Sequence, residues 1–209
     1  MISTLHYISQ PPHITNIQAA CEAGCRWIQL RIKDAPESTI ISEALAAKAI
    51  CDTYGAKLII NDHPHIAKAI NADGVHVGKN DMTVAAARRI TGNDMIVGGT
   101  ANTLADILLH VKEGASYAGL GPYRFTTTKQ GLSPILGPEG IHAIMQKLNT
   151  LNIDIPVIAI GGIQAEDLEE LMGTGIHGIA VSSLITHAAN QQQLVFSITN
   201  YLQSCNHLS

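Results

Sequence analysis

The sequence predicts an α/β fold, a single-domain (β/α)8 TIM barrel. Eight short apolar runs recur along the 209 residues, and segments with a helical period lie between them. No Pro/Gly/Ser linker or change of composition divides the chain, which favours one domain. Aromatic residues make up only 4% of the sequence, so Ile, Val, Leu and Ala must fill the core, as is typical of buried parallel strands. An open doubly wound sheet more often has roughly five to seven strands, so the number of runs favours a closed barrel.

The eight apolar runs give the expected strands, at residues 5–8, 27–31, 57–62, 74–78, 96–100, 117–121, 156–161 and 178–183. The helical period is clearest in two connecting segments, whose apolar faces carry Leu104, Ile107, Leu108 and Val111, and Ile141, Ile144, Met145 and Leu148. The segment between Asp62 and Gly74 is short for a crossover helix, and Pro64 would lie in its first turn.

Helix ends are marked as well. Asn102 or Thr103 is the expected N-cap of one helix, and Gly24, Gly114 and Gly175 are expected C-caps just before strands. Residues 204–209 show no period. We therefore expect the barrel domain to span residues 1–203 and the tail at 204–209 to fray.

Composition limits the classes of partner. The formal net charge of −4 argues against general nucleic-acid or membrane-surface binding, which depends on clustered Lys and Arg. No apolar run approaches the ~18 to 20 residues of a spanning helix, and the first residues lack a signal-peptide pattern. The four cysteines include no Cys-x-x-Cys pair, so reduced thiols are expected. We expect a cytoplasmic protein with no nucleic-acid or membrane partner, and the sequence leaves a homo-oligomer open.

A polar loop follows the sixth expected strand. The loop begins at Gly121-Pro122, which breaks the strand. Its tip is rich in hydrogen-bond donors, namely Arg124, Thr126, Thr127, Thr128 and Lys129. That composition suits a phosphate, although a solvated surface loop would have the same residues.

The second expected strand ends in polar residues. Alternation would place Gln29, Arg31 and Lys33 on one side of the strand. An inward-pointing Arg is costly to bury unless an anion meets it, so a phosphate or diphosphate ligand is expected here. The alternative is an internal ion pair of Arg31 with Asp62 or Asp81.

Two carboxylates, Asp62 and Asp81, follow the third and fourth expected strands. Mg²⁺ usually takes one or two carboxylates together with water and substrate oxygens, so the pair predicts a magnesium site beside the phosphate site. Each residue could instead cap the helix that follows it. His63 and His65 lack a third ligand at a usual zinc spacing. His76 alternates with apolar neighbours, and it reads as a core histidine or one that reaches the barrel mouth.

A second anion site is expected after strands seven and eight. In this fold the loops there recurrently bind phosphate, because glycines let backbone N–H groups approach the ligand. Gly161 and Gly162 follow strand seven, and Ser182 and Ser183 end strand eight. Two anion sites with a metal favour two phosphorylated substrates rather than one.

These motifs resemble the thiamine phosphate synthase family, in the family's order and over nearly the whole chain to about Ile185. They are Gln-Leu-Arg-x-Lys at 29–33, Asn61-Asp62, Asp-Gly-Val-His-x-Gly at 73–78 with Asp81, Gly121-Pro122 leading to Thr-x-Thr-Lys at 126–129, and Ile-Gly-Gly-Ile at 160–163. The resemblance implies a dissociative condensation of a hydroxymethylpyrimidine diphosphate with a thiazole phosphate, which gives thiamine phosphate and pyrophosphate.

The resemblance also implies residue roles. Gln29, Arg31, Lys33 and Asn61 would hold the pyrimidine diphosphate, and Asp62 and Asp81 would bind Mg²⁺. Lys129 would contact the leaving pyrophosphate, and Thr100 would lie near the reacting centre, so Lys129, Thr100 and Arg31 are the expected catalytic residues. The thiazole phosphate would be bound by Thr126, Thr127, Thr128, Gly162, Ser182 and Ser183.

Some positions depart from the family pattern. Lys79 and Asn102 stand where Gln and His are more usual, Arg124-Phe125 replaces a more apolar pair, and Ser182 replaces an apolar residue. Two other functions remain as alternatives. One is a thiazole tautomerase of the same barrel family, which has no use for a diphosphate site. The other is a phosphate-binding barrel without turnover.

Overall fold

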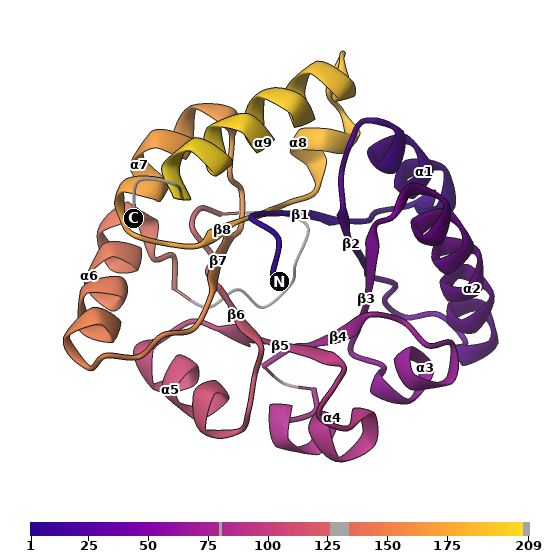
Figure 1. Cartoon of the computed structure of the whole chain (residues 1–209), viewed down its shortest axis with the longest axis horizontal. Helices are drawn as coiled ribbons and strands as arrows, with labels where there is room; N and C mark the ends of the chain where they lie inside the picture. Colours follow the sequence, from indigo (N-terminus) through magenta and orange to yellow (C-terminus); the bar gives the residue numbers. More distant parts are fainter. Residues whose placement is uncertain (80, 126–133, 207–209) are drawn as a thin grey trace.

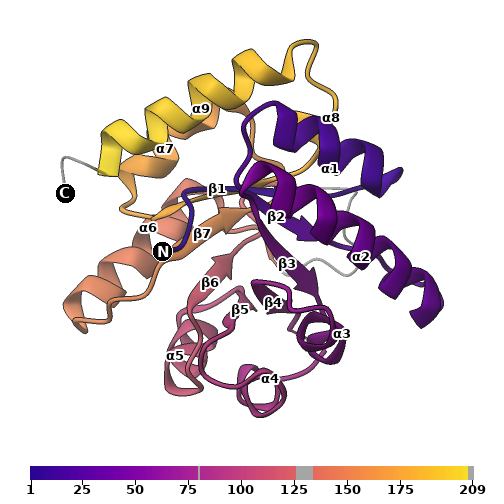
Figure 2. The same cartoon turned by 45° about the vertical axis from the view of Figure 1, so that its right-hand side comes forward.

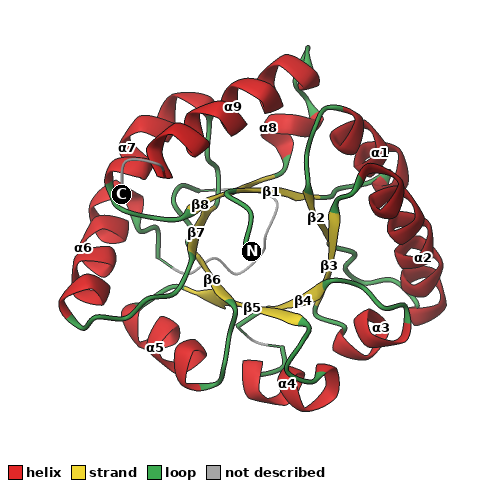
Figure 3. Ribbon diagram, viewed as in Figure 1, coloured by secondary structure: helices red, strands yellow, loops and turns green. Residues whose placement is uncertain are grey.

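Eight parallel strands close into a barrel, and helices surround it (Figures 1 and 3). The computed structural model describes residues 1–79, 81–125 and 134–206. Each strand pairs with the next in sequence, and β8 pairs with β1 to close the sheet, with Leu5 opposite Ile179. The predicted (β/α)8 barrel is therefore confirmed.

The strands lie where the apolar runs predicted them and are mostly shorter by one or two residues. They are β1 (Leu5–Ile8), β2 (Trp27–Leu30), β3 (Lys57–Asn61), β4 (Gly74–Val77), β5 (Ile96–Ala101), β6 (Tyr117–Leu120), β7 (Val157–Ile160) and β8 (Gly178–Val181). Several predicted polar residues thus fall just beyond the carboxyl ends of their strands, where a barrel of this type builds its active site.

The helices follow the strands in the expected alternation. They are α1 (His13–Glu22), α2 (Glu37–Tyr54), α3 (Pro64–Ala69), α4 (Val84–Thr91), α5 (Leu104–Lys112), α6 (Gly137–Thr150), the 3-10 turn η1 (Ala165–Asp167), α7 (Leu168–Gly173), α8 (Ser183–Thr186) and α9 (Gln191–Asn206). Helix α3 is short and carries Pro64 at its start, as predicted. In Figure 2, α9 crosses the outside of the barrel, where it packs against α1 and α8. No helix in the described ranges has the length and apolar character needed to cross a bilayer.

One predicted boundary was wrong. Helix α9 continues to Asn206, so residues 204–206 are helical and do not form a frayed tail. The physical reason is packing just before this turn, because Leu202 is fully buried and Tyr201 packs against the core. Residues 207–209 lie outside the described part of the chain.

The helix ends agree with the sequence pattern. Thr103, rather than Asn102, is the N-cap of α5, and its hydroxyl accepts a hydrogen bond from the N–H of Asp106. Gly24, Gly114 and Gly175 follow helices at positive φ, which glycine adopts without steric cost.

The core has two parts. The larger lies between the sheet and the helices, and it includes the predicted apolar residues Ile107, Ile141, Met145 and Leu148. The smaller consists of Ile8, Trp27, Ile59, Tyr117, Ile158 and Ala180, whose side chains alternate with the larger set and so face the barrel axis. The ring of His6 stacks on Trp27, with 4.2 Å between centroids, so aromatic side chains fill the barrel beneath its mouth.

Candidate active site

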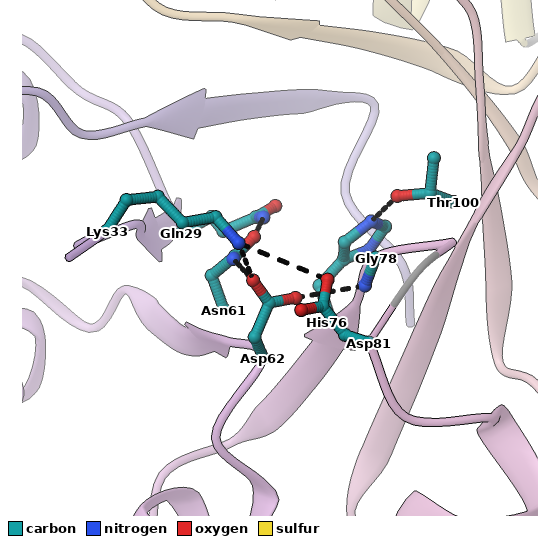
Figure 4. A network of polar contacts seen from close by, with 8 residues as sticks. All are labelled: Gln29, Lys33, Asn61, Asp62, His76, Gly78, Asp81 and Thr100. Atoms are coloured by element: carbon teal, nitrogen blue, oxygen red, sulfur yellow. Dashed lines mark hydrogen bonds and ion pairs between the residues drawn. The ribbon is translucent and has the colours of Figure 1, made fainter. Parts of the chain in front are cut away.

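A cavity of about 410 Å³ opens at the carboxyl ends of the strands. The predicted site residues that line it are Gln29, Arg31, Thr100, Gly162, Ser182 and Ser183. Lys33, Asn61, Asp62 and Asp81 are not part of this lining. They form a polar network beside it, and Gln29 belongs to both groups (Figure 4).

A chain of amides leads from the cavity to the first carboxylate. Gln29 Nε2 donates to Asn61 Oδ1 at 2.7 Å, and Asn61 Nδ2 donates to Asp62 Oδ2 at 2.5 Å. A carboxylate only accepts, so Asp62 fixes which end of the Asn61 amide faces it, and Asn61 in turn orients Gln29. No protein donor to the Oε1 atom of Gln29 is seen within the described ranges, so this atom can accept a hydrogen bond from a ligand in the cavity.

Lys33 pairs with both predicted metal ligands (Figure 4). Its ammonium donates to Asp62 Oδ2 and lies 4.0 Å from Asp81 Oδ2. Asp62 Oδ1 also accepts the N–H of Gly78 at 2.9 Å. Burial alone would raise the pKa of Asp62, but the hydrogen bond and charge of Lys33, with the Gly78 N–H, hold that pKa below its ordinary value. Asp62 is therefore a carboxylate at neutral pH, the state that a metal requires.

Neither carboxylate caps a helix. The N-cap of α3 is His63, and the N-cap of α4 is Thr83, whose hydroxyl accepts the N–H of Ala86. The capping alternatives for Asp62 and Asp81 were thus wrong. A side chain on Gly78 would collide with the Asp81 carboxylate, so glycine there lets Asp81 approach.

Asp62 and Asp81 fit a Mg²⁺ site that the protein shares with substrate oxygens, and they do not fit a site in which the protein supplies every ligand. In the described ranges, no group of three or more His, Cys, Asp or Glu side chains could hold a metal. Two hard carboxylates are what Mg²⁺ uses when phosphate oxygens and water complete its shell.

The alternative for Arg31, an ion pair with Asp62 or Asp81, is not what the structure shows. Lys33, and not Arg31, meets Asp62 and Asp81, and no ion pair of Arg31 is seen in the described part of the chain. Strand β2 ends at Leu30, so strict alternation does not extend to residue 33. The backbone N–H of Arg31 donates to Ser9 Oγ at 3.2 Å, and its side chain lines the cavity.

Thr100 belongs to a hydrogen-bonded row inside the barrel. His76 lies 3.0 Å from Thr100 Oγ1 through Nε2 and 3.0 Å from the Tyr117 hydroxyl through Nδ1. Burial raises the pKa of Tyr117, so its hydroxyl keeps its proton at neutral pH and can either donate a hydrogen bond to Nδ1 or accept one from it. In the tautomer that carries its proton on Nε2, His76 would donate to Thr100 and leave the Thr100 hydroxyl hydrogen for a ligand. Both interpretations of His76 are confirmed, since it is buried and also lines the cavity.

The loops after β7 and β8 form the other side of the cavity. Gly161 and Gly162 have φ values of 108° and 65°, which permit a tight turn at the strand end. Ser183 begins α8 and lines the cavity. The Ser182 hydroxyl donates to the carbonyl of Ile8 at 2.6 Å, so its hydrogen is used within the protein.

The remaining predicted residues, Thr126, Thr127, Thr128 and Lys129, lie outside the described residues. Of the positions that depart from the family pattern, Lys79 pairs with Asp106 at 2.9 Å and Asn102 donates to the carbonyl of Gly121.

Two side-chain contacts of the site were not predicted from the sequence. Tyr117 was predicted only as a strand residue, and no pattern in the neighbouring sequence indicates that its hydroxyl contacts His76. The pairing of Arg124 with Asp167 was also not predicted. A signal for Asp167 was present, since Gln164 and Asp167 have the spacing of a capping box and form one.

Comparison with known proteins identifies the family to which the chain belongs. The family described as Thiamine monophosphate synthase matches residues 3–185. The chain belongs to that family. It is 48% identical over 206 residues to the thiamine-phosphate synthase of Flavobacterium psychrophilum, covering 97% of this chain and 100% of the relative. It is 49% identical over 183 residues to the thiamine-phosphate synthase of Phocaeicola vulgatus, covering 88% of each.

Solved structures agree with the family assignment. The thiamine phosphate pyrophosphorylase of Pyrococcus furiosus superposes with a TM-score of 0.84 at 29% identity, covering 97% of this chain and 96% of that one. A 3-hexulose-6-phosphate synthase superposes with a TM-score of 0.69 at 16% identity, which shows the shared barrel alone.

Proposed function

We propose that the chain condenses 4-amino-2-methyl-5-(diphosphooxymethyl)pyrimidine with a thiazole phosphate, releasing thiamine phosphate and pyrophosphate. One observation carries the proposal. Gln29 and Arg31 at the end of β2, beside the polar network that follows β3 and β4, line the same cavity as the glycine turn that follows β7, and β1 and β8 lie between β2 and β7 in the barrel (Figure 3). Two anionic substrates could therefore meet at its centre.

The side of the cavity formed by β2 and β3 suits the pyrimidine diphosphate. The Oε1 atom of Gln29, oriented through Asn61, can accept a hydrogen bond from the exocyclic amino group of the pyrimidine. Arg31 and Lys33 supply positive charge for the diphosphate, with Lys129 as a further cation assigned through the family resemblance. These cations favour departure of pyrophosphate, because they stabilise the charge that develops on it.

Asp62 and Asp81 are the proposed ligands of Mg²⁺. When bound, this ion would neutralise charge on the diphosphate oxygens and so promote the departure of pyrophosphate. The chain's own groups prepare the site: Asn61 and Gly78 donate to Asp62, and Lys33 counters the two carboxylates. The Thr100 hydroxyl, aligned by His76, lies where it can bind the reacting pyrimidine.

The other side suits the thiazole phosphate. Gly162 and Ser183 are its proposed binding residues there, and Ser182 contributes to the wall. Thr126, Thr127 and Thr128 are retained as proposed ligands on the family resemblance. No general base is required, because the thiazole nitrogen attacks the pyrimidine cation with its own lone pair.

The test is a coupling assay with purified protein, the two substrates and Mg²⁺. Thiamine phosphate is followed by chromatography, pyrophosphate is measured separately, and each component is omitted in turn. Product that requires both substrates and the metal is the expected result. Conversion of the thiazole phosphate alone would favour a tautomerase, and binding of it without conversion would favour a phosphate-binding barrel.

A further inference from the structure

Arg124 joins the loop after β6 to the loop after β7. Its Nη1 donates to Asp167 Oδ2 at 2.9 Å and its Nη2 donates to Asp167 Oδ1 at 2.8 Å. Nη1 also donates to the carbonyl of Gly162 at 3.0 Å. Paired N–H···O bonds between guanidinium and carboxylate combine strength with a fixed geometry. The contact therefore fixes one loop relative to the other at the rim of the cavity.

Asp167 is firmly held on its own side. The side chain is only 7% exposed, and its Oδ2 accepts the N–H of Gln164 at 2.8 Å. Tyr123 precedes Arg124 in the sequence, and its hydroxyl lies 3.3 Å from Asp167 Oδ1. Asp167 thus anchors Arg124 to the start of η1, and both Gln164 and Arg124 line the cavity.

Arg124 holds two successive peptide groups of the glycine turn. Its backbone N–H donates to the carbonyl of Gly161 at 2.8 Å, and its side chain donates to the carbonyl of Gly162. In a trans peptide the N–H points opposite to the C=O. Arg124 therefore sets the directions of the N–H groups of Gly162 and Ile163. Within the described ranges, neither N–H donates a hydrogen bond to the protein, and both residues line the cavity.

We propose that Arg124 and Asp167 are positioning residues that aim the backbone N–H groups of Gly162 and Ile163 at the phosphate of the second substrate. The inference rests on the proposed function, because it deepens the thiazole phosphate site. Consecutive N–H groups in a turn with positive φ form a concave anion site, but only when the turn is held in one conformation. Arg124 supplies that restraint.

The geometry distinguishes this role from direct phosphate binding by Arg124. Both Nη atoms are directed at Asp167, and the carboxylate offsets the guanidinium charge. If Arg124 were itself the ligand, removal of Asp167 would release a cation toward the phosphate and strengthen binding. As a positioning pair, both residues must be present for tight binding.

The experiment compares Arg124→Ala, Asp167→Asn and the double variant with the wild type. Asp167→Asn keeps an oxygen that can accept the Gln164 N–H, so η1 is retained. We expect each single change to raise the KM of the thiazole phosphate about tenfold, and the KM of the pyrimidine diphosphate less than about twofold. The double variant is expected to be no worse than either single one, because all three lose the same contact. Arg124→Lys should recover part of the loss.

The matched control is Lys57→Ala. It breaks an ion pair with Asp73, 3.5 Å long, at the amino ends of the strands, and neither KM is expected to change. Unchanged thiazole phosphate kinetics in Arg124→Ala, additive effects in the double variant, or tighter binding in Asp167→Asn would each overturn the proposal.

Calorimetric titration with thiazole phosphate separates this inference from the proposed function. A wild type that binds thiazole phosphate but makes no product would refute the synthase, while the Kd values of the variants would still test the positioning pair. A wild type that makes product, with unchanged Kd in Arg124→Ala, would refute the positioning pair alone. A wild type that binds no thiazole phosphate would overturn both.

Discussion

The ammonium of Lys33 contacts Asp62 and lies 4.0 Å from the Asp81 carboxylate. In this position one cation offsets one of the two negative charges that follow adjacent strands. Mg²⁺ would have to share or take over that role, so the three side chains act as one electrostatic unit.

Asp62→Asn is expected to raise the Mg²⁺ concentration needed for half-maximal activity by about tenfold or more, because one of two carboxylate ligands loses its charge. The melting temperature should also fall, because an asparagine whose oxygen accepts the Gly78 N–H turns its Nδ2 toward Lys33 and Asn61, which both donate to Asp62 Oδ2. Metal titrations with a calorimetric scan check both. Asp52→Asn, an exposed change on α2, is the control. Unaltered metal dependence would remove Asp62 from the metal site.

Thr100→Val keeps the shape of the side chain and removes its hydroxyl. We expect kcat/KM to fall roughly tenfold, the equivalent of one lost hydrogen bond of about 1.4 kcal/mol. Thr100→Ser retains the hydroxyl bonded to His76 and should stay within about twofold of wild type. Steady-state kinetics on the three proteins decide the point. Equal rates in the valine and serine variants would show that the hydroxyl has no part in the reaction.

Gly98→Ala tests the interior of the barrel. A Cβ at Gly98 would overlap the ring of Tyr117 and lie 2.7 Å from its hydroxyl oxygen. Overpacking of this kind costs about 1–3 kcal/mol, and it would also displace the partner of His76. Denaturant unfolding should show the lost stability, accompanied by a fall in kcat. Gly173→Ala is the matched control, because within the described part of the chain no heavy atom beyond its own helix backbone and chain neighbours lies within 4 Å of its added Cβ. Wild-type stability in Gly98→Ala would contradict this packing.

The capping box of α5 should make stability depend on pH. Burial would raise the pKa of Asp106, but the hydrogen bond from Lys79 and the N–H groups of Asn102 and Thr103 lower it overall. A carboxyl with a lowered pKa in the folded state stabilises the protein above its unfolded-state pKa of about 4 and loses that contribution as pH falls through the folded value.

Unfolding free energies of wild type and Asp106→Asn should therefore differ most near pH 6 to 7 and converge below about pH 4. Urea titrations between about pH 3 and pH 7 measure the difference. Asp94→Asn, at an exposed position before β5, is the control variant. A constant gap between wild type and Asp106→Asn at every pH would exclude ionisation of Asp106 as the cause.

Much of the fold could be predicted because its signals are local. Strand runs, helix periods and glycines after helices each depend on neighbours in sequence, and all appear in the structure. Asp62 and Asp81 could be brought together from sequence because parallel strands end at one rim of the barrel.

Contacts that depend on the register of the barrel could not be predicted. Tyr117 on β6 meets His76 on β4 across Gly98 on β5, and the two are 41 residues apart. Arg124 and Asp167 are 43 residues apart and meet only because β6 and β7 are neighbours. Lys33, and not Arg31, is the partner of the two carboxylates, and the cause is local. Strand β2 ends at Leu30, so the strand alternation that would place residues 29, 31 and 33 on one side does not extend to Arg31 and Lys33.

The most direct test asks whether the two sides of the cavity serve different substrates. Initial rates of pyrophosphate release are measured with both substrates varied, in wild type, Arg31→Gln and Ser183→Ala. We predict that Arg31→Gln raises the KM of the pyrimidine diphosphate about tenfold or more and leaves that of the thiazole phosphate nearly unchanged, and that Ser183→Ala does the reverse. If both variants raise the KM of the same substrate, the division of the cavity between two phosphorylated substrates is wrong.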